Sequence, residues 1–373
     1  MSRWRKVAPW LLVLAVLHGI VVCAGFFAPY DPIEQDRKNP YLPPMRLHFV
    51  DTHKHLHLRP FVYAFTLRPG SFDQYMEDTS HPLPLKFFVA GDRYRLLGLL
   101  PARLHLFGAD NERIYLLGSD AFGRDQLSRL LFGGQVSLLA GLLGAGFTLL
   151  IGWCIGAAAG YYGGWRDDLL MRVAELFLAL PWLYLLFAIR AFLPLAVNPL
   201  QAFFLIVAVI AAVGWARPAR LVRGIVLSAK ERDFVRAARG FGASDVYLLR
   251  RHILPETSSV LLTQTAILIP QYVLAEMTLS FLGLGVPEPV PSWGNLLSNL
   301  QQYSVLVSYW WMYLPALIMV PFFLGYLGLA SALQESPGAY KIERRSLGSL
   351  AGETAPLRSH AAGFFSGRSS FSP

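Results

Sequence analysis

Residues 136–165 read VSLLAGLLGAGFTLLIGWCIGAAAGYYGGW, a stretch without a single charged side chain. As a helix that rises 1.5 Å per residue it would be about 45 Å long, whereas the hydrocarbon core of a bilayer is about 30 Å thick. The stretch is therefore long enough to cross a membrane. Gly152, Gly156 and Gly160 recur at every fourth position, which predicts a face of small residues on which another helix packs closely. We expect packing, and no binding site, on this face.

The composition of the whole chain agrees with a membrane protein. Hydrophobic residues make up 54% of the 373 residues and charged residues only 15%, and the mean hydropathy is +0.42. So few charges cannot cover the surface of a soluble protein of this size, whose charged fraction would be about 25%. The net charge of +9 is typical of basic loops that face a cytoplasm and anionic lipid, and we consider it weaker support for nucleic-acid binding.

Five further apolar runs bring the predicted number of spanning helices to six, so the sequence predicts an all-α polytopic membrane protein. These runs cover 7–30, 176 to about 195, about 200–216, 257–285 and about 308–333. Nine Lys and Arg side chains lie between 217 and 251, and in a chain with six crossings this segment follows the fourth one, on the same side as Arg3, Arg5 and Lys6. Because basic loops stay inside, we expect both termini to be cytoplasmic in a multi-pass protein of the cell (inner) membrane.

The first run is interpreted as an uncleaved anchor, so residues 1–30 form the cytoplasmic N-terminal end and the first transmembrane helix. Residues 31–135 then face outward as an extracytoplasmic insertion that is small and partly β. Alternating apolar residues in 84–100 around Gly91-Asp92 predict a β-hairpin. His53, His55 and His57 would share one face of a strand and, with His48, could bind a soft divalent metal, but we favour a solvated basic patch because no nearby Cys completes a site.

The core, 136–335, holds the other five helices, and the tail at 336–373 is rich in Ser, Gly, Ala and Pro and is predicted to be disordered. A long polar loop at 217–256 interrupts the core. Within it, 233–239 has helical spacing, Gly240-Phe241-Gly242 breaks the helix, and Ser244 is a good N-cap for a second short helix that we expect Pro255 to end. The pattern predicts a compact knob of two helices joined by a glycine elbow.

The segment 236–242, RAARGFG, followed by Ile253-Leu254-Pro255, resembles the EAA loop of ABC importer permeases. Four other segments are similar to the dipeptide/oligopeptide/nickel permeases, in particular to their second-permease (C-type) subunit: LGSDAFGRD at 117–125, AGYYGG at 159–164, LSFLGLG at 279–285 and PSWG at 291–294. The resemblance covers the first helix and residues 115–337. The insertion is longer than most members carry.

The resemblance implies a type I ABC importer permease fold with no catalytic residue and no bound metal. It implies that the EAA-like loop docks on an ATP-hydrolysing subunit through Arg236, Ala237, Ala238, Gly242, Ile253, Leu254 and Pro255. Arg236 stands where the family usually has Glu, which reverses a charge at that contact. The implied partners are a second homologous permease, two ATP-binding subunits, an extracytoplasmic substrate-binding protein and the lipid bilayer, and nucleic acid is not among them.

Several polar residues in or near the apolar runs invite functional readings. Glu276 interrupts the fifth run, so we expect it, with Ser280, to line the pathway or pair across a subunit interface. Glu175 and Arg190 are explained by interfacial placement, and His18 by a partner on a neighbouring helix. Asp120, Arg124 and Asp125 precede the second run, and we expect a structural cap over the pore mouth there in which Arg124 neutralises its neighbours.

The expected function is that of a permease subunit in an ATP-driven importer, most simply for di- or oligopeptides, which works by alternating access with a second permease. The sequence contains no Gly-x-x-x-x-Gly-Lys-Ser/Thr phosphate loop, so no cofactor is expected on this chain and ATP is bound by partner subunits. Nickel or a peptide-like compound is the alternative cargo. A polytopic membrane enzyme and a channel or ion-driven transporter are the alternatives from other classes.

Overall fold

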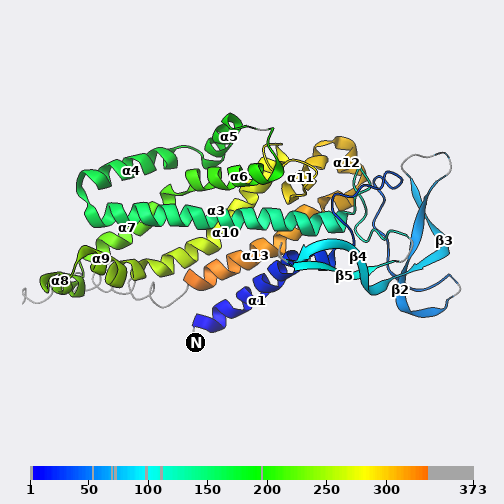
Figure 1. The fold of residues 1–373 in the computed structure, drawn as a ribbon, viewed down its shortest axis with the longest axis horizontal. Helices are drawn as coiled ribbons and strands as arrows, with labels where there is room; N and C mark the ends of the chain where they lie inside the picture. Colours follow the sequence, from blue (N-terminus) through cyan, green and yellow to red (C-terminus); the bar gives the residue numbers. More distant parts are fainter. Residues whose placement is uncertain are drawn as a thin grey trace, which may run out of the picture.

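The computed structural model describes residues 3–52, 54–68, 70, 74–96, 100–109, 112–194 and 196–334. The predicted tail at 336–373 lies outside the described residues. Figure 1 shows an elongated molecule in which long helices run side by side, short helices form one end, and β-strands form the other.

Four described helices are long and apolar enough to cross a membrane by themselves or with short continuations: α1 (Arg3–Val22), α3 (Gln126–Tyr162), α10 (Ser258–Phe281) and α13 (Leu314–Gln334). Two bent pairs pass the same test together. In one pair α4 (Gly164–Ala179) meets α5 (Trp182–Phe192) at 94°, and in the other α6 (Pro199–Gly214) meets α7 (Ala216–Lys230) at 45°. The described residues thus hold four such spans, or up to six if each bent pair is one span.

The two bends correct the predicted boundaries of the third and fourth runs. Leu180 and Pro181 separate α4 from α5, because a proline restricts the residue before it and has no N–H to continue a helix. Pro218 acts similarly near the start of α7, where it cannot donate to the carbonyl of Gly214. The first part of the predicted polar loop, 217–230, is therefore the helix α7.

The glycine face of α3 packs against α7, as predicted. A Cβ atom on Gly152 would lie 2.7 Å from the Pro218 side chain, and one on Gly156 would lie 2.3 Å from the Ala219 carbonyl oxygen. Gly160 is as tightly enclosed by Arg223 and Val226. These glycines allow the two backbones to touch, which α3 and α7 need because neither can rely on water to drive their association inside a bilayer.

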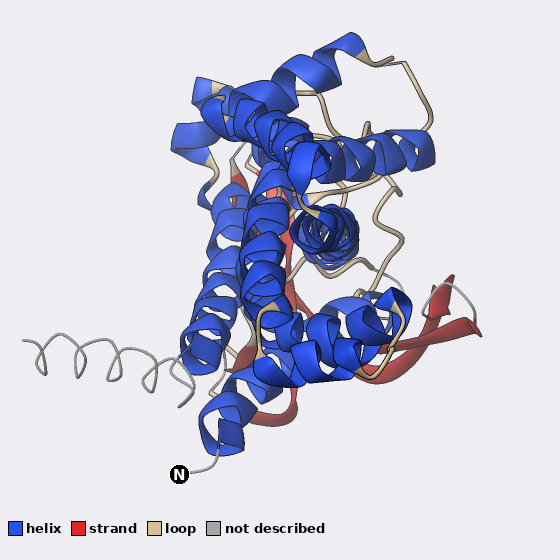
Figure 2. Cartoon of the chain, turned by 90° about the vertical axis from the view of Figure 1, so that its left-hand side faces the viewer, coloured by secondary structure: helices blue, strands red, loops and turns tan. Residues whose placement is uncertain are grey.

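Side chains of α3, α6, α10 and α13 form the main apolar core, which includes Ile206, Ile210, Tyr272 and Phe322. The first helix packs on α13, where His18 Nε2 lies 3.1 Å from the Tyr326 hydroxyl oxygen, and its Nδ1 lies 2.8 Å from the carbonyl oxygen of Leu14. This confirms that the histidine finds a partner on a neighbouring helix. Figure 2, a view along the long axis, shows the helices gathered into one bundle.

Shorter helices complete the chain: α2 (Ala24–Phe27), α8 (Asp233–Gly240), α9 (Asp245–Leu248), α11 (Trp293–Ser298) and α12 (Tyr303–Ser308). A π-helical turn covers Leu249–Ile253, and 3-10 turns cover Leu254–Thr257, Asn299–Gln301 and Trp310–Tyr313.

Two antiparallel sheets lie between α2 and α3 in the sequence. One has the order β1 (His48–Val50), β2 (Leu56–Leu67), β3 (Tyr75–Pro84), and the other pairs β4 (Lys86–Leu96) with β5 (Leu100–Gly108). A small apolar core of its own, including Leu42, Val62, Leu85, Phe107 and Tyr115, supports the two sheets. The predicted insertion is therefore a folded, partly β unit in the described residues.

The position predicted from the sequence for the turn of the hairpin is wrong. Gly91 and Asp92 lie inside β4, where the register with β5 shifts between Ala90 and Tyr94, and β4 ends only at Leu96. The reason is a long-range contact: a Cβ on Gly91 would lie 2.7 Å from the His105 ring, whose Nε2 lies 3.0 Å from the Asp92 carbonyl oxygen. Gly91 and Asp92 therefore accommodate the His105 side chain within a strand and do not form a turn.

The histidine group does not form a metal site among the described residues. His55 and His57 both lie beside the carboxylate of Asp51, with N···O distances of 3.3 and 3.1 Å, while His48 packs on aromatic rings. His53 lies outside the described residues. The exposed, paired imidazoles fit the predicted basic patch better than a metal centre.

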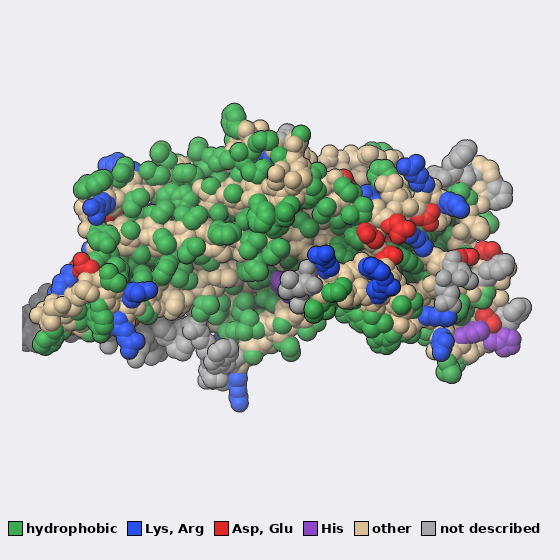
Figure 3. Space-filling model, in the orientation of Figure 1, with side chains coloured by type: hydrophobic (Ala, Val, Ile, Leu, Met, Phe, Trp, Pro, Cys, Tyr) green, Lys and Arg blue, Asp and Glu red, His purple; other side chains and the backbone are tan. Residues whose placement is uncertain are grey.

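Figure 3 shows a broad hydrophobic surface over the helical part, with Lys, Arg, Asp and Glu side chains gathered at its two ends. The exposed apolar side chains belong mainly to the long helices, for example Leu12, Leu142, Leu150 and Leu317. Such a belt is what a bilayer requires of the protein that it surrounds.

The contact between α3 and α7 generates a stability prediction. We expect Gly156→Ala to lower the stability of the chain by roughly 1–3 kcal/mol, because the added methyl group overlaps the Ala219 carbonyl oxygen. Gly146→Ala is the matched control, since no atom lies within 4 Å of a Cβ at that position of the same helix. Thermal unfolding in detergent measures the difference, and equal midpoints for the two variants would contradict it.

Candidate functional site

The short helices at one end of the molecule form the knob, which we define as residues 231–257. Helix α8 ends in a Schellman motif: the Gly242 amide donates to the Arg239 carbonyl and the Ala243 amide to the Ala238 carbonyl. Gly242 has φ of +85°, in the left-handed region that only glycine adopts without strain. Ser244 then caps α9 by accepting a hydrogen bond from the Tyr247 amide, as predicted.

The second helix of the knob does not end at Pro255. After α9 the chain passes through the π-helical and 3-10 turns directly into α10, so that 245–281 is one continuous helical stretch. Pro255 occupies the start of the 3-10 turn, where its missing N–H is tolerated. The knob is consequently joined rigidly to α7 on one side and to α10 on the other.

Apolar side chains pack the knob against the ends of α3 and α7. Val235, Leu248 and Ile253 are fully or almost fully buried against Val222 and Val226 of α7 and other residues of this cluster. Ala238 and Ala243 are partly buried against the same cluster. The structure separates three residues that the sequence predicts to lie together in the docking contact. Ala237 is exposed, Ala238 is half-buried, and Ile253 belongs to the core.

Polar contacts also connect the knob to the ends of these helices. The Tyr161 hydroxyl, at the end of α3, donates to the carboxylate of Asp245 and accepts a hydrogen bond of 3.3 Å from Arg239. The Lys230 ammonium donates to the Gly160 carbonyl at 3.1 Å. Arg232 and Glu256 pair at 2.9 Å and tie the two ends of the knob together. These contacts connect the knob to the ends of α3 and α7.

The outer face of the knob exposes several apolar side chains among its charged ones. Phe241 has 93% of its surface exposed, and Phe234, Val246 and Tyr247 are also exposed. Arg236 on this face donates a hydrogen bond to Glu231, which holds the pKa of the Glu231 carboxyl below its usual value. Sequence reasoning placed Arg236, Ala237, Gly242 and Pro255 on an accessible loop, and all four are exposed. It missed Phe234 and Phe241. These two residues could have been noticed as aromatic side chains in a largely polar loop.

A second candidate site surrounds Glu276, which is 0% exposed. The Ser280 hydroxyl donates to Glu276 Oε1 at 2.6 Å, and Ser137 of α3 and Ser292 before α11 face the same carboxyl group. No described residue donates a hydrogen bond to Glu276 Oε2. The carboxyl lies inside the chain in this structure, and its role in the pathway or in an interface stays a prediction.

Two sequence segments, 279–285 and 291–294, meet at this carboxyl. A Cβ on Gly294 would lie 2.4 Å from the Met277 carbonyl oxygen, and one on Gly285 would lie 1.8 Å from the Ser280 hydroxyl. The Trp293 indole donates to the Leu130 carbonyl at 2.9 Å, and its backbone amide donates to the Ser137 hydroxyl at 3.1 Å. The glycines and the tryptophan therefore fold the chain tightly over Ser280 and α3.

A cluster of charges lies at the opposite end from the knob. Arg124 Nε is 2.7 Å from Asp120 Oδ2, and both Arg124 and Arg129 pair with Glu288 at 2.7 and 2.8 Å. This confirms that Arg124 neutralises Asp120. Asp125 is not part of the pairs but caps α3 by accepting from the Ser128 amide, and burial raises the pKa of its carboxyl to about 6.

Glu288 and Arg129 were missed in the sequence because Glu288 lies more than 150 positions from its partners, at 159 from Arg129 and 164 from Arg124. The interfacial placement predicted for Arg190 stays a prediction. This side chain is only 1% exposed and donates to the Pro194 carbonyl at 3.2 Å, because α5 ends two residues later and turns its carbonyl groups toward the arginine. Glu175 is exposed on α4.

Comparison with known proteins shows a family likeness. Residues 152–336 match the family described as "Binding-protein-dependent transport system inner membrane component". The chain is 37% identical over 208 residues to the oligopeptide transport system permease protein OppC of Haemophilus influenzae, a match that covers 56% of this chain and 65% of that protein.

Two other relatives give similar values. Identity to the dipeptide transport system permease protein DppC of Bacillus subtilis is 32% over 220 residues, covering 59% of this chain and 67% of the relative. Identity to OppC of Mycobacterium bovis is 38% over 205 residues, covering 55% and 68%. The chain thus spans about two thirds of the length of the relatives it matches. A solved structure titled as an inward-facing conformation of the MetNI methionine ABC transporter aligns with a TM-score of 0.41 at 19% identity, covering 55% of this chain and 95% of that one.

The geometry of the elbow predicts the effect of Gly242→Val. A side chain in the left-handed region costs about 1–2 kcal/mol, and a β-branched one is the least tolerated, so the knob should open roughly tenfold more often. Trypsin cleavage after Arg239 and Arg250 should accelerate accordingly. Gly240→Ala is the matched control, because Gly240 is helical and has open space around its Cβ position. Equal cleavage rates in both variants would show that the elbow is not strained.

Proposed function

This chain belongs to the family of binding-protein-dependent transport system inner membrane components, and on that premise we propose that it is a membrane-spanning subunit of an ATP-driven importer of peptides. The relatives named as oligopeptide and dipeptide permeases support this choice of cargo over nickel or a peptide-like compound. Selection of the individual peptide is assigned to a separate extracytoplasmic binding protein.

The knob is the observation that carries the proposal. It is a compact projection at one end of the molecule that exposes aromatic side chains such as Phe241, and it is tied through Val235, Leu248 and Tyr161 to the ends of α3 and α7. A surface of this kind fits a groove in a partner protein. We assign it to an ATP-binding subunit, so that closure of that subunit moves the knob and, through it, the helices.

The proposed contact includes Arg236, Ala237, Gly242, Leu254 and Pro255, with Ala238 and Ile253 as the core that shapes it. Arg236 uses one N–H group on Glu231 of its own chain, and a guanidinium group has five N–H donors. The remaining donors favour an acidic or carbonyl-rich patch on the ATP-binding subunit, where relatives with Glu would favour a basic one.

Alternating access requires a second wall for the pathway, so we propose a second, homologous permease beside this chain and a pair of ATP-binding subunits below the two. The type I arrangement with six crossings follows from counting each bent helix pair as one span. In this scheme Glu276 and Ser280 hold α10 against α3 and α11 near the pathway or the permease interface. No phosphate-binding loop occurs in the sequence, so ATP is bound by the partners.

The proposed orientation places the knob in the cytoplasm and the sheets outside. The N-terminal end of α1 points toward the knob end of the molecule (Figure 1). Helix α7 and the knob, whose sequences are rich in Lys and Arg, lie at the same end. This arrangement agrees with the rule that basic segments stay on the cytoplasmic side. A membrane enzyme is not favoured, because the relatives are named as permeases of transport systems.

Reporter fusions test the orientation. Alkaline phosphatase joined near Gly70 should be active, because this position is proposed to lie outside, whereas the same enzyme joined near Lys230 should be inactive. A cytoplasmic reporter such as green fluorescent protein provides the reciprocal control. The opposite pattern of activities would refute the orientation.

Uptake by the reconstituted complex tests the function. The chain, its second permease, the ATP-binding subunits and the binding protein encoded beside it should together drive ATP-dependent uptake of a labelled oligopeptide. Ala237→Asp should lower that uptake by roughly tenfold, because it would bury an unpaired carboxylate in the contact with the ATP-binding subunit. Ala237→Ser, which keeps the residue small, should transport at nearly the normal rate. Normal uptake by Ala237→Asp with the ATP-binding subunits attached would remove the knob from the proposed contact.

A further inference from the structure

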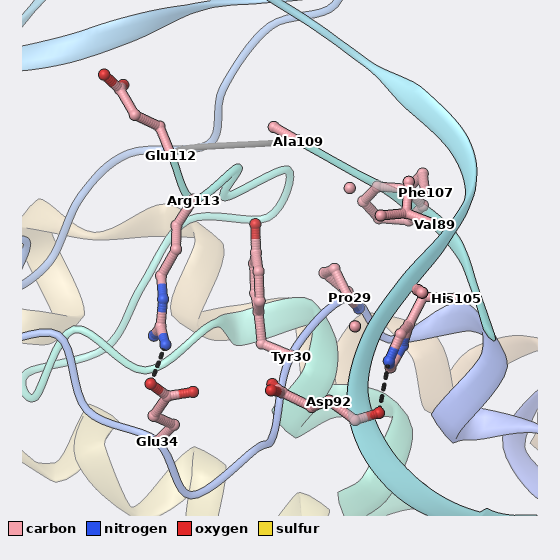
Figure 4. A pocket seen from close by; sticks show the side chains of 13 residues that line it. Pro29, Tyr30, Glu34, Val89, Asp92, His105, Phe107, Ala109, Glu112 and Arg113 are labelled. Carbon is pink, nitrogen blue, oxygen red and sulfur yellow. Dashed lines mark hydrogen bonds and ion pairs between the residues drawn. The ribbon is translucent and has the colours of Figure 1, made fainter. Parts of the chain in front are cut away.

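The hairpin formed by β4 and β5 is attached to the outer end of the first membrane helix. The Tyr94 ring lies so close to Gly25 of α2 that a Cβ there would be 2.2 Å from it, and His105 Nδ1 lies 2.6 Å from the Ala28 carbonyl oxygen. The rings of Phe26 and Phe88 lie 6.4 Å apart between their centroids. Figure 4 shows His105 and Asp92 in the wall of the pocket between this hairpin and Tyr30.

These contacts fix the depth of the hairpin relative to a bilayer. Gly25 lies in the charge-free stretch 7–30, nineteen residues after Lys6, which corresponds to about 28 Å along a helix. This is close to the thickness of the hydrocarbon core, so Tyr94 lies near the boundary opposite to Lys6. Helix α1 exposes the apolar side chains of Ile20 and Val22 within about one turn of Gly25, so the surface next to the hairpin is apolar as well.

The free end of the hairpin is apolar, and arginines flank it. Leu96 and Leu100 are paired across the strands, and the sequence between them is Leu-Gly-Leu. Leu100 is 61% exposed and Leu104 is 47% exposed. Arg93, Arg95 and Arg103 follow within a few residues on both strands and are exposed as well.

The hairpin points back along the molecule. Figure 1 shows the paired ends of β4 and β5 beside the outer end of α1 and not among the other strands, and the contact of Tyr94 with Gly25 confirms this proximity. In Figure 3 Lys and Arg side chains lie near the border of the hydrophobic belt in this part of the molecule. The exposed leucines at this border are suited to contact acyl chains. The guanidinium groups that flank them are suited to contact lipid phosphate groups.

We propose that the β4–β5 hairpin is an interfacial lipid anchor of the outer leaflet. Leu96, Leu100 and Leu104 enter the edge of the hydrocarbon, Tyr94 lies at the boundary, and Arg95 and Arg103 bind headgroup phosphates. An amphipathic element with this order of residues is held by buried apolar area together with attraction to anionic lipid. The anchor would hold the insertion at a constant height and angle over the bundle, independently of what the protein transports.

A fluorescent probe tests the anchor in the full chain. After Cys23 and Cys154 are replaced by alanine, Leu100→Cys is labelled with an environment-sensitive dye, and the purified chain is placed in nanodiscs of phosphatidylcholine and phosphatidylglycerol. Lipids with a doxyl group near the headgroup should quench this probe several-fold more strongly than one at Leu58→Cys, which lies on β2 and is 98% exposed. Leu104→Cys provides a second position if the first variant folds poorly.

Charge reversal tests the arginines. Arg95→Glu combined with Arg103→Glu should weaken doxyl quenching of the Leu100 probe, whereas Arg59→Glu on β2 should leave it unchanged. Quenching by iodide in water that is as strong at Leu100 as at Leu58 would overturn the proposal and identify the hairpin as a surface for another protein. Doxyl quenching that is insensitive to the double reversal would overturn the role of the arginines.

Discussion

The close contact of α3 with α7 is the constraint on which the rest of the structure depends. Helices in a bilayer gain little from the hydrophobic effect when they associate, so they must gain from close packing. Gly152, Gly156 and Gly160 permit that packing by leaving no side chain between the two backbones. Helix α3 then serves as a long rod whose ends carry the two polar parts of the molecule, Asp125 at its N-cap and Tyr161 near its C-terminus.

Polar groups inside the apolar part of the chain are paired across helices. His18 joins α1 to α13, and Glu276 with Ser280 lies where α10, α3 and the segment before α11 meet. At the outer end Arg124 and Arg129 share Glu288, a residue of the distant loop before α11. Each pair specifies which elements adjoin, because an unpaired polar group in a medium without water is costly. The pairs therefore select one arrangement among several that apolar packing alone would allow.

The two ends of the molecule differ in how they are built. The knob is held by an apolar seat under a short helix and by the Tyr161, Arg239 and Asp245 contacts, so its exposed face is rigidly oriented. The sheets carry a separate small core and reach the bundle through the outer charge cluster and through the β4–β5 hairpin at Gly25. The knob is thus held by the bundle, whereas the sheets have an apolar core of their own.

The sequence by itself determined the long apolar helices α1, α3, α10 and α13, the glycine face of α3, the elbow at Gly242 and the cap at Ser244, because each rests on residues within a few turns of one another. The tertiary structure decided what depends on distant partners. It placed Gly91 and Asp92 inside a strand under His105, buried Arg190 beside the Pro194 carbonyl, and brought Glu288 to two arginines. It also continued the knob into α10 past Pro255 and turned Ala238 toward the core while Ala237 stayed exposed. Local spacing specifies which helices form, but the orientation of a side chain around a helix and its burial depend on what packs against that helix, and this is set by contacts between segments far apart in the chain.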